Sequence, residues 1–399
     1  MNSNHRPGTH GVLNFIITCL ILAPWQAFAA HAFITEVTVY HEKDDGYFIH
    51  RIPALLTTDK GTLLAFCEAR SESASDAAPT DIALRRSLDN GKTWTQAQVV
   101  AHFANYTVGN PAPVQDRRAG IIWLLLTVNP AGVSEKEICA GSLRGTRTVW
   151  VTHSSDDGAT WAPAEEITST TKKQDWTWYA TGPGNGIQLE DGRMVIPCDY
   201  KVAVTQAFYA HVIYSDDDGK TWKIGGSAGP QTNESAVVQL ADASLLLNMR
   251  SYAGQHRRAI AHSHDGGLTW SPVQLDEALI EPVCQATFIR YTLARTGEKN
   301  RLLFANPADV ARDRMTVRLS YDEGKTWPVA RTVYEGFSEY SSLAILKDGS
   351  IGLLYTKGPG KPTPQNGWYP PVNPAIVFAH FNLEWLTHGA DHLGVRANP

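Results

Sequence analysis

Ser154-Ser-Asp156-Asp-Gly158-Ala-Thr160-Trp161 is one of five stretches in this chain that share the pattern Ser-x-Asp-x-Gly-x-Thr-Trp. The other four begin at Ser87, Ser215, Ser263 and Ser320. In such an octapeptide the Asp carboxylate can accept backbone N–H bonds, the glycine supplies a positive φ, and the tryptophan packs beneath the turn. Each copy follows a run of strand-forming residues, so the pattern predicts a hairpin turn five times over.

The spacing of these boxes indicates a repeated architecture. Successive box serines, at positions 87, 154, 215, 263 and 320, lie 67, 61, 48 and 57 residues apart. Propeller repeats run at roughly 40 to 50 residues, which is one four-stranded blade with some longer loops. The segments before Ser87 and after Trp327 together supply a sixth blade, closed by pairing strands from the two ends of the chain. We therefore predict an all-β fold, a six-bladed β-propeller with five box turns, as a single domain over residues 30–399.

The composition fits a globular protein and argues against two classes of ligand. The 399 residues are 43% hydrophobic and 19% charged, enough for a large core. A formal net charge of −5 without a long basic run argues against nucleic acid. Outside the first 29 residues the cysteines are widely spaced and form no CxxC pair, which argues against a zinc site. They are core thiols or form one or two disulfides: Cys67, Cys139, Cys198 and Cys284.

The first 29 residues have the pattern of an export signal. Arg6 precedes an apolar stretch over residues 12–24, and Ala27-Phe28-Ala29 follows as a small-x-small cleavage signature. The apolar stretch is shorter than the roughly 20 residues that a membrane helix needs. We expect a signal peptide over residues 1–29, a secreted or periplasmic protein, and no membrane span after cleavage.

Three arginines are candidates for a ligand site. In a propeller the ligand normally binds at the central mouth, which loops from several blades build, so its residues are scattered in sequence. Arg51, Arg250 and Arg318 each lie among apolar or strand-forming residues. An arginine in such a place needs an anion or water. Taken singly, each is explained as well by an ion pair with a neighbouring carboxylate.

Segments across nearly the whole chain, in the same order as in the family, resemble the exo-α-sialidases, most closely the lysosomal-type and bacterial ones. The resemblance starts with Arg51, Phe66-Cys67-Glu68-Ala69-Arg70, Asp76 and Ile82-Ala-Leu-Arg-Arg-Ser87. It continues through Gly182-Pro-Gly-Asn-Gly-Ile187, Asn233-Glu234-Ser235, Asn248-Met-Arg250-Ser251, Val317-Arg318-Leu-Ser320 and Tyr340-Ser-Ser-Leu-Ala344. In this family the five boxes are called Asp boxes, and they occupy peripheral turns, so we assign their aspartates no catalysis.

The resemblance implies a substrate-binding set. Arg51, Arg250 and Arg318 match the three arginines that clamp the carboxylate of a sialic acid through charge-assisted bonds. Arg70 matches a further pocket arginine that contacts the hydroxyl edge of the sugar. The implied partners are sialylated glycoconjugates, and the implied reaction needs no metal or organic cofactor.

The resemblance also implies a catalytic set. Tyr340 matches the nucleophile, Glu234 its base, and Asp76, in the loop over residues 71–79, the acid/base carboxyl. The anomeric carbon of a sialoside carries a carboxylate, so a neutral tyrosine approaches it without the repulsion that an Asp or Glu nucleophile would meet. Sialidases accordingly depart from the two-carboxylate rule of glycosidases. The expected reaction retains configuration through a tyrosyl intermediate.

One position departs from the family pattern. A glutamate commonly follows the tyrosine of the last strand and supports the first arginine, but here Tyr355 is followed by Thr356. A substitute carboxylate for Arg51 could come from elsewhere, such as Glu335 or Glu339, the arginine could be held more loosely, or the specificity could be altered. The sequence leaves these alternatives open.

The predicted function is that of a secreted, retaining exo-α-sialidase. The sequence predicts no oligomeric state. Trp176, Trp178 and Tyr179 are candidates for a pocket wall against the acyl group of the sugar, with core packing as the alternative. One rival is a non-catalytic propeller that binds sialylated glycans, which would not need the set Asp76, Glu234 and Tyr340. Another is a trans-sialidase or a hydrolase of the deaminated sugar.

Overall fold

A computed structural model describes residues 1–3, 8, 31–141, 144–360 and 374–394, and it confirms the all-β prediction. The helical segments within these ranges are short: α1 Glu135–Cys139, α2 Thr168–Thr171, α3 Leu383–Leu386, and the 3-10 turns η1 Asp44–Gly46 and η2 Ala294–Thr296. No helix in the described ranges is long and apolar enough to cross a membrane. The predicted signal peptide lies almost wholly outside them, since residues 4–7 and 9–30 are not described.

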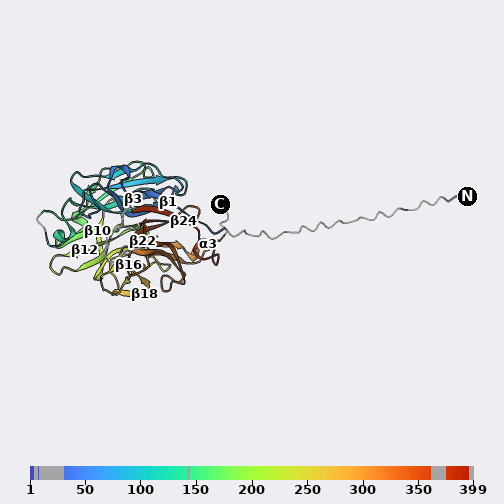
Figure 1. Ribbon diagram of the computed structural model, residues 1–399. Helices are drawn as coiled ribbons and strands as arrows, with labels where there is room; N and C mark the ends of the chain where they lie inside the picture. Colours follow the sequence, from blue (N-terminus) through green and yellow to red (C-terminus); the bar gives the residue numbers. More distant parts are fainter. Residues whose placement is uncertain (4–7, 9–30, 142–143, 361–373, 395–399) are drawn as a thin grey trace.

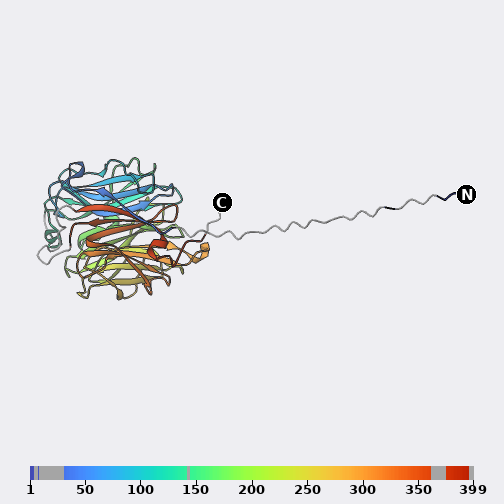
Figure 2. The same ribbon diagram turned by 45° about the vertical axis from the view of Figure 1, so that its right-hand side comes forward.

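The strands follow one another in antiparallel groups (Figures 1 and 2). The first group is β2 Ile49–Thr57, β3 Leu63–Arg70, β4 Thr80–Ser87 and β5 Gln98–Ala101. The second is β6 Tyr106–Gln115, β7 Ile122–Pro130, β8 Thr148–Ser154 and β9 Glu165–Glu166. The third is β10 Trp176–Thr181, β11 Ile187–Gln188, β12 Met194–Val202, β13 Phe208–Ser215 and β14 Lys223–Pro230. The fourth is β15 Thr232–Gln239, β16 Leu245–Ser251, β17 Arg257–Ser263 and β18 Gln274–Ile280.

The last two groups share one long strand. β22 Val329–Ile345 pairs with β21 over its first half and with β23 over its second. The fifth group is β19 Thr287–Thr292, β20 Arg301–Pro307, β21 Asp313–Ser320 and the first half of β22. The sixth is the second half of β22, β23 Ile351–Lys357, β24 Ala375–Phe381 and β1 Ile34–Tyr40. β1 and β24, from opposite ends of the chain, are paired antiparallel and lie side by side in Figure 1.

The five boxes form the same turn, each between the last two strands of a group. In the second group Ser154 Oγ donates to Asp156 Oδ1 at 2.8 Å, and Thr160 donates to Asp156 through its backbone N and its Oγ1. The glycines have φ between 78° and 91°, which other residues rarely adopt. A Cβ on Gly219 would lie 2.2 Å from the ring of Trp123, so this turn also requires glycine for close packing.

The cysteine question is settled within the described residues. Cys67, Cys139, Cys198 and Cys284 are all buried free thiols. They are therefore core residues, which was one of the two alternatives.

Candidate functional site

The first strand of five groups carries a β-bulge. In each case three residue steps on that strand face two on its partner, so one residue is inserted. The shifts lie between Arg51 and Ala54 in β2, Gly109 and Ala112 in β6, Trp176 and Tyr179 in β10, Thr232 and Ser235 in β15, and Ser338 and Ser341 in β22. An extra residue breaks the two-residue alternation of side chains and re-aims them. These bulges build the candidate site.

The bulges border a cavity of about 930 Å³. Its wall includes six of the seven site residues that the sequence predicts, brought together from three strand groups and one loop: Arg51, Arg70, Asp76, Glu234, Arg250 and Tyr340. Consecutive residues contribute in β15, where Asn233 and Glu234 both line the cavity. A regular strand would turn one of the two away.

Tyr340, Glu234 and Arg250 form one hydrogen-bonded chain. The hydroxyl of Tyr340 donates to Glu234 Oε1 at 2.6 Å, and Arg250 Nη1 donates to Glu234 Oε2 at 2.8 Å. Burial and then the Glu234 carboxylate raise the pKa of Tyr340 well above its ordinary value. The phenol is therefore neutral at rest, with a carboxylate placed to take its proton.

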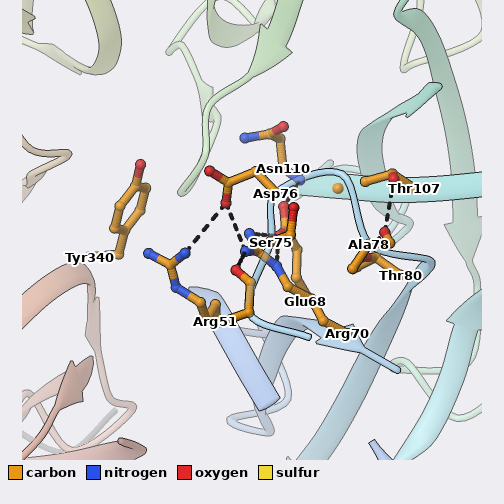
Figure 3. A network of polar contacts seen from close by, with 12 residues as sticks. Arg51, Glu68, Arg70, Ser75, Asp76, Ala78, Thr80, Thr107, Asn110 and Tyr340 are labelled. Carbon is orange, nitrogen blue, oxygen red and sulfur yellow. Dashed lines mark hydrogen bonds and ion pairs between the residues drawn. The ribbon is translucent and has the colours of Figure 1, made fainter. Parts of the chain in front are cut away.

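Asp76 lies between two arginines (Figure 3). Its Oδ1 is 2.7 Å from Arg70 Nη1 and 3.3 Å from Arg51 Nη1, although 68% of its side chain is exposed. Desolvation alone would raise the pKa of Asp76, but Arg70 and Arg51 together lower it to about 2. Arg70 is held in turn by Glu68, whose Oε2 accepts from its Nη2 at 2.6 Å. Asp76 is thus a carboxylate in the resting protein.

Glu339 supplies the carboxylate that the sequence left unassigned. It is fully buried, accepts from Arg51 Nε and Nη2 at 3.0–3.1 Å, and accepts from Arg312 Nη1 at 2.6 Å. Burial alone would raise its pKa, but Arg51 and Arg312 hold the pKa of Glu339 below its ordinary value. Thr356 lies on β23 between the residues that pair with Ser338 and Ser341, opposite this bulge. The carboxylate that holds Arg51 therefore comes from β22, the strand that faces Thr356. The other alternative, Glu335, approaches Arg314 instead.

The structure does not bring Arg318 to the cavity. Its Nη1 donates to Asn306 Oδ1 at 3.1 Å, and burial lowers its pKa. Arg312, just before β21, lines the cavity instead and lies 5.7 Å from the centroid of the Tyr340 ring. Sequence reasoning missed Arg312 because it lies in a polar loop, whereas Arg318 lies in a strand-forming run. Aspartates and arginines alternate closely around residue 312, and nothing in that pattern singles out Arg312 as a site residue.

The backbone beside Arg51 is strained. Ile52 has φ 57°, a conformation that costs a β-branched residue about 1–2 kcal/mol. Its side chain is buried against Tyr340 and Cys284. Packing against the phenol ring thus holds the bulge that aims Arg51.

Of the aromatic residues and box aspartates considered in the sequence, one aromatic lines the cavity and the others lie elsewhere. Trp178 lines the cavity, whereas Trp176 and Tyr179 belong to the core beside it. Asp156 and its four counterparts lie in the turns between the last two strands of a group and not in the cavity wall. A second cavity of about 810 Å³ contains none of the predicted site residues, and its arginines have protein partners, such as Glu323 for Arg290.

Comparisons with known proteins agree with this arrangement. The BNR repeat-like domain matches residues 61–353. A sialidase from Micromonospora viridifaciens is 34% identical over 375 residues, covering 87% of this chain, and the chain spans 54% of that protein. An exo-alpha-sialidase from Aspergillus fumigatus is 30% identical over 382 residues, covering 87% of each chain. The solved structure of Hadza microbial sialidase Hz136 is 30% identical with a TM-score of 0.78, covering 88% of this chain and 69% of the other.

Proposed function

Because the chain belongs to the sialidase family with BNR repeats, we propose that it hydrolyses terminal α-linked sialic acids from glycoconjugates with retention of configuration. The observation that carries this proposal is the chain from Tyr340 through Glu234 to Arg250, with 2.6 and 2.8 Å hydrogen bonds. A binding protein gains nothing from a buried phenol paired with a base. The Asp76 carboxyl supplies the acid that a glycosidase needs.

The substrate carboxylate binds to Arg51, Arg250 and Arg312. Glu339 and Glu234 hold these guanidinium groups in place, so little side-chain freedom is lost on binding. The three arginines come from different strand groups and surround Tyr340. The same contacts place the anomeric carbon beside the phenolic oxygen.

Tyr340 attacks the anomeric carbon as Glu234 takes its proton. The bond from that carbon to the leaving oxygen breaks, and Asp76 gives the leaving oxygen a proton. In the second half Asp76 removes a proton from water, the water oxygen bonds to the anomeric carbon, and the tyrosine oxygen leaves with the proton from Glu234. Two inversions give net retention.

Substrate binding prepares Asp76 for its role as an acid. In the resting protein Arg51 Nη1 donates to Asp76 Oδ1 at 3.3 Å and to no other of the described residues. A substrate carboxylate on Arg51 takes over that donor and adds a negative charge nearby. Both changes raise the pKa of Asp76 from about 2 toward the range in which it holds a proton.

We infer that the six strand groups form a closed six-bladed propeller. Each box glycine packs on the preceding group: Gly158 on Leu64, Gly219 on Trp123, Gly267 on Val212 and Gly324 on Leu246. Gly91, in the first group, packs on Phe378 of β24 in the sixth. The order therefore returns to its start, and the β1–β24 pair supports closure of the ring. The sixth group has no box because its fourth strand, β1, comes from the other end of the chain.

We also propose that residues 1–29 export the chain and are then removed, which leaves residues 30–399 as the catalytic domain. The apolar stretch and the Ala27-Phe28-Ala29 signature support this. Mass spectrometry of protein recovered from outside the cytoplasm tests it. A mature chain that starts at Ala30 is expected, and a chain that retains Met1 would refute it.

Proton NMR of an α-sialoside during hydrolysis tests the proposed reaction. The α-anomer of the free sugar is expected to appear first and then to mutarotate. First appearance of the β-anomer would refute retention, and no hydrolysis by the folded protein would refute the enzyme. Addition of lactose distinguishes transfer from hydrolysis, because a transferase would form sialyllactose.

A further inference from the structure

The fifth strand group differs from the other five at the cavity end of its first strand. The other first strands carry a bulge there, but the register shift of β19 lies between Arg290 and Thr292, at the end that lines the second cavity. The segment 281–286 leads into β19, and it is irregular and buried except at Val283. No residue of this segment, which the structure describes throughout, lines the main cavity. Any effect of the segment on the site therefore passes through its neighbours.

Gln285 holds the main chain directly after Tyr340. Its Oε1 accepts from Ser341 N at 2.9 Å, and its Nε2 donates to Ser341 O at 3.0 Å and to Pro183 O at 3.2 Å. The side-chain amide thus supplies the pair of bonds that a neighbouring strand would supply. The bulge between Ser338 and Ser341 leaves Tyr340 outside the regular register of β22 with β23. The position of Tyr340 therefore depends on how Ser341 is held.

Glu281, at the other end of the segment, holds the main chain directly after Arg250. Glu281 Oε1 accepts from Ser251 N at 2.8 Å, and Oε2 accepts from Arg258 Nη1 at 2.7 Å. The same Nη1 donates to Cys284 O at 2.7 Å. Arg258 and Glu281 are both fully buried, so neither charge has water as an alternative partner. This ion pair joins Ser251 to the residue that precedes Gln285.

The backbone between these two anchors is strained. Val283 has φ 55°, a region that β-branched residues rarely adopt. Strained backbone persists where the surrounding contacts over-determine it. The next residue, Cys284, is buried against Tyr340 and Ile52. The bonds of Glu281 and Gln285 thus hold the segment against the ring of the tyrosine.

We propose that the segment 281–286 is a positioning element for the catalytic chain, with Gln285 as its principal residue. Tyr340 and Arg250 are the two partners of Glu234 in that chain, and the segment holds the residue that follows each of them. It therefore sets the separation of the phenol and the guanidinium on the two sides of the base. Gln285 is a positioning residue, since it does not line the cavity in which substrate binds. This inference rests on the proposed function.

The test compares Gln285→Met with Thr287→Val as the matched control. Met keeps the length of the side chain and loses all three hydrogen bonds. Thr287 Oγ1 accepts from Leu343 N at 3.0 Å, so Thr287→Val also removes a buried bond to β22, two residues beyond Ser341. In Gln285→Met we expect kcat on a nitrophenyl sialoside to fall about ten- to a hundredfold, because a small misplacement of the nucleophile is costly. KM should change by less than about twofold, because Arg51 and Arg312 keep Glu339.

Thr287→Val is expected to keep its kcat, whatever stability it loses. Equal losses of kcat per folded molecule in the two variants would overturn the proposal, because both lose buried bonds to the same strand. An unchanged kcat in Gln285→Met, or a change confined to KM, would also overturn it. Gln285→Glu gives the same comparison if the Met variant does not fold, since it keeps the acceptor for Ser341 N and loses the donors.

Crystal structures of the unchanged protein and the variants test the geometry without turnover. In Gln285→Met we expect the phenolic oxygen of Tyr340 to lie beyond hydrogen-bond distance of Glu234, and in Thr287→Val to stay near 2.6 Å. A bond kept in both variants would refute the positioning role alone. An unchanged protein that has this bond but cleaves no sialoside would refute the proposed reaction alone.

Discussion

The Asp-box turns and the bulges of the first strands are both local interruptions of regular sheet, but they are built differently. Each box repeats the same set of side-chain bonds, such as those of Ser154, Asp156 and Thr160, and closes on itself. Each bulge inserts one residue into the first strand of a group but presents different side chains. Those of β2, β15 and β22 carry Arg51, Glu234 and Tyr340. The boxes hold strand groups together, and the bulges aim residues into one cavity.

This difference explains how one repeated architecture carries one unrepeated site. Identical box turns pack each group on the one before it and need no variation. The bulges share only a backbone irregularity, so each can present a different side chain to the cavity. Substitutions in the bulges should therefore change chemistry, and substitutions in the boxes should change stability.

The largest effect is expected for Tyr340→Phe, which removes the hydroxyl bonded to Glu234. Loss of a nucleophile should lower kcat by roughly a thousandfold or more, measured by fluorophore release from an α-sialoside. Tyr355→Phe is the matched control, because Tyr355 is also buried and donates to a carboxylate, Glu36, at 2.8 Å outside the cavity. If the two variants were equally active per folded molecule, the site would lie elsewhere.

Asp76→Ala should have an effect that depends on the leaving group. Removal of a general acid costs about a hundred- to ten-thousandfold in rate when the leaving oxygen needs a proton. With sialyllactose we expect a loss in that range, and with a nitrophenyl sialoside a loss below about tenfold, since nitrophenolate leaves without help. Equal losses on both substrates would argue that Asp76 only holds Arg51 and Arg70 in place.

Glu339→Gln should weaken both arginines that it holds. Arg51 and Arg312 would lose their buried counter-ion, which typically costs about 3–5 kcal/mol of stability. We expect kcat/KM to fall about tenfold or more, with most of the change in KM. Adding Thr356→Glu should restore part of the loss, because position 356 lies opposite the bulge. Full activity and stability in the single variant would contradict the role of Glu339.

The smallest effect on activity is expected for Asp156→Ala. It removes three hydrogen bonds of one box and should lower the free energy of unfolding by about 1–3 kcal/mol, with kcat and KM unchanged. Thr160 donates the bonds that lower the pKa of Asp156 to about 2. The stability difference should therefore persist above about pH 4 and shrink as the pH falls toward 2. Chemical denaturation at several pH values measures this difference in the free energy of unfolding. A loss of kcat would contradict the view that the boxes contribute to stability and the bulges to catalysis.

The sequence predicts the boxes better than the bulges for a physical reason. A box is specified by its own eight residues, such as those from Ser154 to Trp161, so its turn could be predicted directly. A bulge depends on pairing with the next strand and leaves no local pattern. Tyr340 and Glu234 were found only through the family resemblance.

Arg312 and Glu339 show what the resemblance could not supply. Arg318 matched a family segment, yet the strand register of β21 directs it to Asn306. Arg312 reaches the cavity from the loop before that strand. Glu339 was one of two candidates for the position opposite Arg51, and only the three-dimensional pairing of β22 with β23 distinguishes it from Glu335.

Trapping the covalent intermediate tests the central claim most directly. A fluorinated sialosyl fluoride slows the second half of the reaction, so a sugar attached to the nucleophile should accumulate. Digestion and mass spectrometry are expected to find that sugar on Tyr340, and none on the Tyr340→Phe variant. A sugar on Glu234 or Asp76, or turnover with no attached sugar, would contradict the account.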